Sequence, residues 1–115
     1  TNLKLLRMHL KQNQAAALST VNVEICGIRI GDFVMVTFGG ELTVEIGLAI
    51  KKRSPAHNTF VAGYTNGYIY YLPTEQQRSN SGYAQEDCDC IVAPEWQRLF
   101  DERTDSVLQR LAASE

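Results

Sequence analysis

The fold of this chain is decided by residues 33–62, which read FVMVTFGGELTVEIGLAIKKRSPAHNTFVA. This stretch begins with a nearly continuous apolar run, residues 33–38, which is typical of a strand buried on both faces. Apolar residues then recur at helical spacing, so residues 41–53 are predicted to form a helix. Residues 59–62 are a second apolar run and are predicted to be another buried strand. Strand, helix and strand in this order favour a βαβ unit with parallel strands.

Upstream of this stretch the pattern changes from helix to strand. Residues 2–17 place leucines at helical spacing and predict a helix. Apolar and polar residues alternate over residues 21–25 and again over 28–30, which predicts half-exposed strands. Gly31-Asp32 follows directly and predicts a hairpin turn into the buried strand.

Downstream, residues 75–93 are polar and contain glycine, so they are predicted to form a long loop. Pro94-Glu95 then opens a final helix with an apolar stripe, because proline suits the first turn of a helix. The prediction for the whole chain is an α/β fold in which a mixed sheet of about four strands is packed with three helices in layers. We expect residues 1–115 to form a single domain.

Composition and charge exclude several classes of function. The 115 residues carry 11 basic and 13 acidic side chains, and no basic stripe is visible, which argues against a nucleic-acid partner. The compact basic run at residues 51–53 suits the C-terminus of a helix, where cations complement the dipole. No stretch reaches the ~18 apolar residues that a membrane-spanning helix needs, so no transmembrane segment is expected.

The cysteines and histidines form no recognisable metal motif. Cys26, Cys88 and Cys90 are odd in number, and the last two are spaced C-x-C instead of the C-x-x-C of common zinc or redox sites. Ordinary thiols and a metal or redox role for the C-x-C pair both stay open. His9 and His57 stand apart from each other and are interpreted as surface or loop residues.

Topology brings two polar segments to the same rim of the predicted sheet. Glu41 follows Gly39-Gly40 at the carboxyl end of one buried strand, and the tyrosine-rich residues 64–71 follow the next. Ligands in open α/β sheets collect at the carboxyl ends of strands. Two structural explanations stay open beside this one: Glu41 complements a helix dipole, and the tyrosines are half-buried strand residues.

The second segment also resembles a known family signature. Residues 60–74, FVAGYTNGYIYYLPT, are similar to the G-x-x-N-x-Y-x-x-Y-x-x-T signature of the neutral/alkaline ceramidase family. Gly40-Glu41 resembles the P-G-E segment of that family, and Gly82-Tyr83 resembles its E-x-x-x-Y region. Together with the last helix, the resemblance covers roughly residues 28–112.

The resemblance implies a zinc-dependent amidohydrolase of lipid metabolism, which cleaves the N-acyl amide of the sphingolipid ceramide into sphingosine and a fatty acid. In that family two histidines, a glutamate and a tyrosine hold one zinc ion. The glutamate matches Glu41 and the tyrosine matches Tyr71. The earlier motif positions match Tyr68, which would act at the catalytic site by hydrogen-bonding a substrate oxygen, and Asn66, which would bind substrate.

The sequence also departs from the family. The histidine ligands belong to upstream H-x-H-type motifs that His9 and His57 do not reproduce, and Gly39 replaces the proline of the P-G-E segment. A catalytic zinc site needs three protein ligands and a water. We therefore expect the C-terminal portion of a ceramidase-like hydrolase domain, inactive alone, whose zinc histidines are supplied from outside this chain.

The substrate would be a lipid or another small amide. Such a portion of a domain exposes apolar surface through which the chain can self-associate. Members of the family are often secreted, but no segment of this sequence indicates a compartment. The alternative is a non-catalytic α/β binding or interaction module derived from the same fold.

Overall fold

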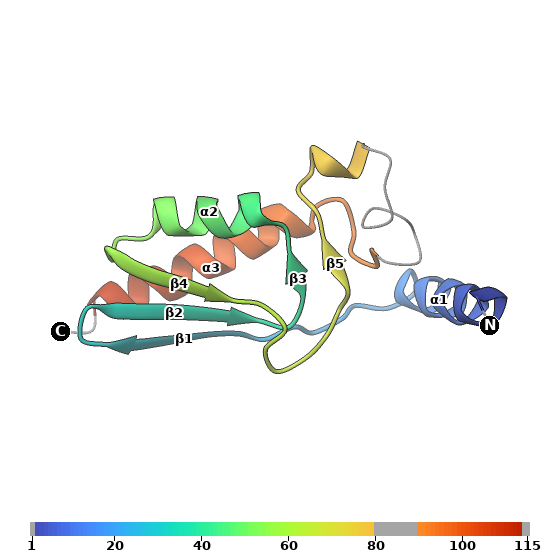
Figure 1. The fold of residues 1–115 in the computed structure, drawn as a ribbon, viewed down its shortest axis with the longest axis horizontal. Coiled ribbons are helices and arrows are strands. Elements are labelled where there is room, and N and C mark those ends of the chain that lie inside the picture. Colours follow the sequence, from blue (N-terminus) through green and yellow to red (C-terminus); the bar gives the residue numbers. More distant parts are fainter. Residues whose placement is uncertain (1, 80–89, 114–115) are drawn as a thin grey trace.

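The computed structural model describes residues 2–79 and 90–113 (Figure 1). The predicted α/β class with a mixed sheet is confirmed. The described elements are α1 (Asn2–Ala16), β1 (Ile25–Ile30), β2 (Phe33–Phe38), β3 (Glu41–Leu42), α2 (Val44–Arg53), β4 (Asn58–Ala62), β5 (Tyr71–Leu72), a short 3-10 helix (Gln77–Ser79) and α3 (Trp96–Ala113).

The strands form two sheets instead of one. The larger sheet has the order β1-β2-β4, with β1 antiparallel and β4 parallel to the central strand β2. The predicted hairpin turn joins β1 to β2, and Gly31 takes a left-handed φ of 58° there. The parallel pairing of β2 with β4 confirms the predicted βαβ unit. The smaller sheet pairs β3 with β5 in parallel.

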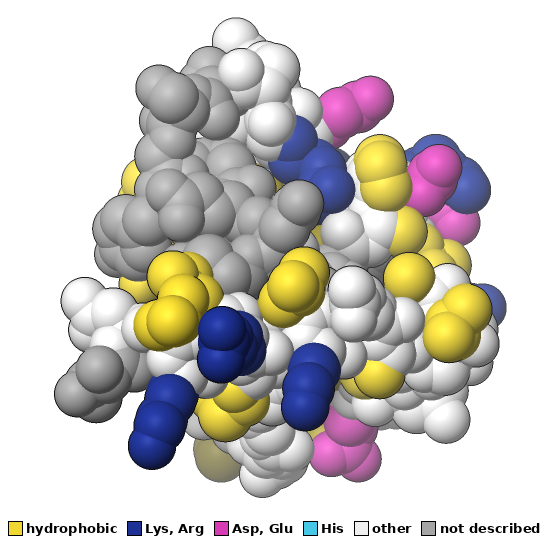
Figure 2. Space-filling view, turned by 90° about the vertical axis from the view of Figure 1, so that its right-hand side faces the viewer, with side chains coloured by type: hydrophobic (Ala, Val, Ile, Leu, Met, Phe, Trp, Pro, Cys, Tyr) yellow, Lys and Arg dark blue, Asp and Glu magenta, His cyan; other side chains and the backbone are white. Residues whose placement is uncertain are grey.

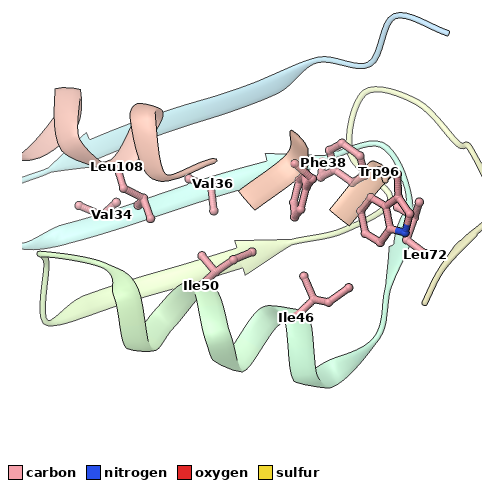
Figure 3. Close-up of a cluster of buried hydrophobic side chains, with 9 residues drawn as sticks. Val34, Val36, Phe38, Ile46, Ile50, Leu72, Trp96 and Leu108 are labelled. Carbon is pink, nitrogen blue, oxygen red and sulfur yellow. The ribbon is translucent and has the colours of Figure 1, made fainter. Parts of the chain in front are cut away.

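The core lies between the larger sheet and the two helices α2 and α3, which pack on the same face of it (Figures 1 and 3). Its aromatic part joins β2 to α3, because the Phe38 and Phe100 ring centroids lie 4.5 Å apart. Trp96 closes this end, and its indole N–H donates to the Pro73 carbonyl over 3.1 Å. The buried apolar residues are Val34, Val36, Phe38, Ile46, Ile50, Leu72, Trp96, Phe100 and Leu108.

Ion pairs also connect helices α2 and α3. The Arg53 guanidinium donates to Asp101 over 2.7 Å and to Asp105 over 3.0 Å. Burial lowers the pKa of Arg53, but hydrogen bonds and attraction from the two aspartates outweigh it, so its pKa is raised overall. The basic run at residues 51–53 closes α2, as predicted, and one of its cations bridges to the neighbouring helix.

The outer face of the larger sheet is only partly covered. Phe60 on β4 is 49 % exposed, and Phe33 and Met35 on β2 are half-buried. The predictions that β2 is buried on both faces and that β4 is a buried strand are therefore wrong for this outer face. The apolar run puts large side chains on alternate faces, but the described helices cover only one of them.

Two predicted boundaries are also wrong for reasons of pairing. The helix predicted over residues 41–53 begins at Val44, because the Glu41 N–H donates to the Tyr70 carbonyl over 3.0 Å and the Thr43 N–H donates to the Leu72 carbonyl over 3.3 Å. Because of these hydrogen bonds, Glu41 belongs to strand β3 and not to the helix. Residues 21–24 lie outside β1, whose first residue, Ile25, pairs with the last residue of β2.

Helix α1 lies at one end of an elongated molecule measuring 52 × 25 × 24 Å (Figure 1). The Tyr70 hydroxyl donates to the Gln12 side-chain oxygen over 3.0 Å, and the His9 ring meets the Tyr70 ring edge-on at 5.5 Å. Within residues 2–79 and 90–113 no helix is both long enough and apolar enough to cross a membrane.

Candidate functional site

Glu41 and Tyr71 are direct neighbours in the β3–β5 ladder. They are paired in register, and Leu42 pairs with Leu72 one position further on. Neighbouring strands lie about 4.8 Å apart, and paired residues send their side chains to the same face. Leu72 is fully buried in the core. Successive side chains alternate, so the Glu41 carboxylate and the Tyr71 phenol start from adjacent positions on the face away from the core.

Close packing of glycine backbones builds this ladder. The Tyr64 N–H donates to the Gly40 carbonyl over 3.2 Å, and the Ile69 N–H donates to the Gly39 carbonyl over 2.8 Å. A Cβ on Gly63 would stand 2.9 Å from the Gly40 oxygen. Residues 63–70 therefore wrap around the link between β2 and β3 at a distance that only glycine permits.

The wrapping loop contains three left-handed residues that are not glycine. Tyr64, Asn66 and Tyr70 have φ values of 54°, 58° and 64°. Asparagine tolerates this conformation, whereas a tyrosine there costs of order 1–3 kcal/mol. The backbone bonds to Gly39 and Gly40 hold the loop in this shape. Asn66 is exposed and has a clear backbone role; its assignment as a substrate-binding residue stays a prediction.

Tyr68 belongs to a row of aromatic rings on this loop. Its ring stacks on Tyr64 with centroids 5.6 Å apart and planes 9° from parallel, and it meets Tyr70 at 5.1 Å. The row continues from Tyr70 to His9 on α1. Tyr64 and Tyr68 are exposed, so their rings are accessible to solvent. The structure thus gives Tyr68 a packing role, and its catalytic role stays a prediction.

A shallow groove of ≈ 280 Å³ lies beside Glu41, between β3 and the first turns of α2. Lys51 and Glu41 bring opposite charges to its lining, and Leu42, Val44 and Leu48 bring apolar surface. The hydroxyl of Thr43, the residue preceding α2, is buried without a hydrogen-bond partner among the described residues. Sequence reasoning missed this groove. Gly47 is a sequence signal for the groove, because a glycine one helical turn before Lys51 leaves space on the surface of the helix.

His57 does not join Glu41 and Tyr71 in a metal site. His57 immediately precedes β4, whereas Glu41 follows the far end of the parallel strand β2. Five strand residues at ~3.3 Å each separate these two ends of the sheet. The residues described in the structure contain no group of three His, Cys, Asp or Glu side chains that could hold a metal ion.

Cys90 is a buried thiol with a structural position. It forms an isolated β-bridge with Tyr70, and its sulfur accepts from the Arg78 guanidinium over 3.2 Å. The same guanidinium donates to the Val92 carbonyl over 3.1 Å. Cys88, Gly82 and Tyr83 lie outside the described residues, so the C-x-C pair and the E-x-x-x-Y resemblance stay predictions.

Comparisons of this chain with protein-family models, with curated proteins and with solved structures find no match. The candidate site is accordingly defined by its own geometry. It consists of the Glu41–Tyr71 pair, the exposed rings of Tyr64 and Tyr68, and the groove that runs from Glu41 to Lys51.

Proposed function

We propose that this chain contributes Glu41 and Tyr71 to the zinc site of an amide hydrolase resembling neutral ceramidase, and that the histidine ligands come from outside residues 1–115. The observation that supports this proposal is the register of the β3–β5 ladder, which pairs these two residues directly. Had they been one position out of register, their side chains would leave opposite faces of the ladder and could not share an ion.

The donor set suits zinc as two of its ligands. Zinc accepts carboxylate oxygen at about 2.0–2.2 Å, and a phenol ligates once it has lost its proton, which ordinarily leaves near pH ~10. A bound zinc ion would polarise an amide carbonyl and lower the pKa of a water molecule. Glu41 would supply negative charge to the ion, and Tyr71 would fix its position beside the ladder.

The groove beside Glu41 fits the proposed substrate class. Its apolar lining from Leu42, Val44 and Leu48 would accept an aliphatic chain next to the amide. The hydroxyl of Tyr68 would donate to a substrate oxygen. A lipid amide satisfies both features, because it combines one polar group with a long apolar tail.

A second candidate function is a binding module that keeps this fold without the metal. The packing of Gly39, Gly40 and Gly63 and the left-handed tyrosine loop favour it, because they give the resembling motif a purely structural explanation. Such a module would use the groove and the exposed tyrosine rings to bind a ligand, and Glu41 and Tyr71 would make no joint contribution to zinc binding.

Zinc titration by calorimetry separates the two functions. We expect the isolated chain to bind zinc weakly, because two ligands do not complete a site, and we expect Glu41→Gln and Tyr71→Phe each to abolish that binding. Glu45→Gln and Tyr64→Phe are matched controls, since Glu45 lies in the first turn of α2 and Tyr64 in the row of stacked rings. Both controls should bind zinc like the parent chain.

The activity of the isolated chain gives a second test. A fluorogenic N-acyl amide should not be turned over by residues 1–115 with or without added zinc. Clear turnover by this chain, or zinc binding that survives both Glu41→Gln and Tyr71→Phe, would contradict the proposal. The second result would favour the binding module.

A further inference from the structure

Helix α1 carries two parallel stripes of different chemistry that the candidate site does not use. Each of three leucines is followed at once by a cation, and the pairs recur at steps of three and four residues. These steps align each set along the helix, and successive residues lie 100° apart around it, so the stripes run side by side. The stripes are Leu3, Leu6 and Leu10, and Lys4, Arg7 and Lys11.

The apolar stripe is open to solvent. The large apolar side chains of α1 are between 46 % and 61 % exposed, namely Leu3, Leu5, Leu6, Met8 and Leu10. Among the described residues, Gln12 and His9 both contact Tyr70. These two residues lie on the side of the helix away from the cations. The cation stripe thus faces away from the anchoring contact, and the leucine stripe lies exposed beside it.

The N-terminal segment that contains this helix has a net positive charge, whereas the rest of the chain has a net negative charge. Residues 1–23 contain three cations and no Asp or Glu, which leaves eight basic and 13 acidic residues in 24–115. Figure 2 views the end of the molecule where α1 lies, and basic and apolar side chains adjoin one another across its lower part. An anionic surface would therefore attract α1 and repel the remainder of the chain.

We propose that α1 docks onto an anionic lipid bilayer and lies flat in its interface. The leucine stripe would enter the boundary between headgroups and acyl chains to a depth of about 5–10 Å, and the adjacent cations would reach out to the phosphates. Helix α1 lies at one end of the long axis of the molecule, so it can lie on a bilayer without the rest of the chain in the way (Figure 1). This inference stands independently of the hydrolase proposal.

Vesicle co-sedimentation of the full chain tests the proposal. The chain should sediment with phosphatidylcholine vesicles that contain phosphatidylserine, remain in solution with pure phosphatidylcholine, and dissociate at high salt. Each cation near an anionic surface contributes roughly fivefold, so Lys4→Gln/Arg7→Gln/Lys11→Gln should weaken binding by about a hundredfold. The matched control Lys52→Gln/Arg98→Gln/Arg103→Gln removes the same charge from other helices and should leave binding unchanged.

A fluorescence reporter tests whether the leucine stripe enters the lipid. In the background of Trp96→Phe, Leu6→Trp provides a single indole, whose emission should shift to the blue and be quenched by brominated acyl chains only in phosphatidylserine vesicles. Unchanged binding by the triple cation variant overturns the proposal. A second result would also overturn it: the chain binds neither kind of vesicle and elutes as a dimer, and Leu3→Gln/Leu6→Gln/Leu10→Gln converts this dimer to a monomer. The leucine stripe of α1 would then bind a second copy of the chain.

Discussion

The backbones of Gly39 and Gly67 lie in direct contact, although these residues are 28 positions apart in the chain: a Cβ on Gly39 would stand 3.2 Å from the Gly67 Cα. This contact fastens the tyrosine loop to the link between β2 and β3. Because the loop is held in this position, Tyr71, which directly follows it, pairs in register with Glu41. The candidate site therefore depends on a backbone approach that lies outside it.

Gly40→Ala should destabilise the chain by about 1–3 kcal/mol, because the added methyl group would collide with Leu72 and stand 3.1 Å from Ile69 Cγ1. Gly47→Ala is the matched control in α2, where a Cβ meets nothing within 4 Å. It should stabilise the chain by roughly 0.5–1 kcal/mol. Urea unfolding measures both changes, and equal effects would contradict the close packing at Gly40.

Ile50→Ala should cost about 2–5 kcal/mol of unfolding free energy, since this side chain is 0 % exposed and its loss leaves a cavity beneath the sheet. Leu48 lies on the same helix but is 59 % exposed. Leu48→Ala should therefore change stability by less than about 0.5 kcal/mol. If the two variants unfolded at the same urea concentration, α2 would not face the sheet as described.

Arg53→Gln and Asp101→Asn should each lower stability by at most about 1 kcal/mol, because the 2.7 Å ion pair between them lies at the surface, with 33 % and 28 % of its two side chains exposed. A double-mutant cycle in urea isolates the pair. The coupling energy should shrink at ~1 M salt, where the Debye length falls to about 3 Å. A coupling that is large and insensitive to salt would indicate a pair shielded from water.

Asn66→Gly should leave stability almost unchanged, whereas Asn66→Val should lose about 1–2 kcal/mol, because residue 66 has a φ of 58° that a β-branched residue adopts poorly. Thermal unfolding measures both variants. This pair also isolates the backbone role of Asn66 from its predicted role in binding substrate. Comparable losses in both variants would show that the amide side chain itself stabilises the loop.

Periodicity in the sequence was sufficient for the elements whose formation is local. The apolar run before Gly39 predicts β2, the helical repeat predicts the body of α2, and Gly31-Asp32 predicts the hairpin turn. The βαβ connection follows from their order. Each of these features depends on neighbours a few residues apart, which a single sequence displays directly.

The tertiary structure alone decided where Glu41 lies and which surfaces are covered. Glu41 fits a helical repeat, yet it joins a strand because its N–H bonds to Tyr70, a residue distant in the chain. Whether a residue such as Phe60 is buried depends on which face of the sheet the helices occupy. The sequence determined the helices and strands because hydrogen bonding and side-chain spacing within them are local. The pairing of distant strands and the choice of which sheet face is covered are non-local, so only the folded chain decides them.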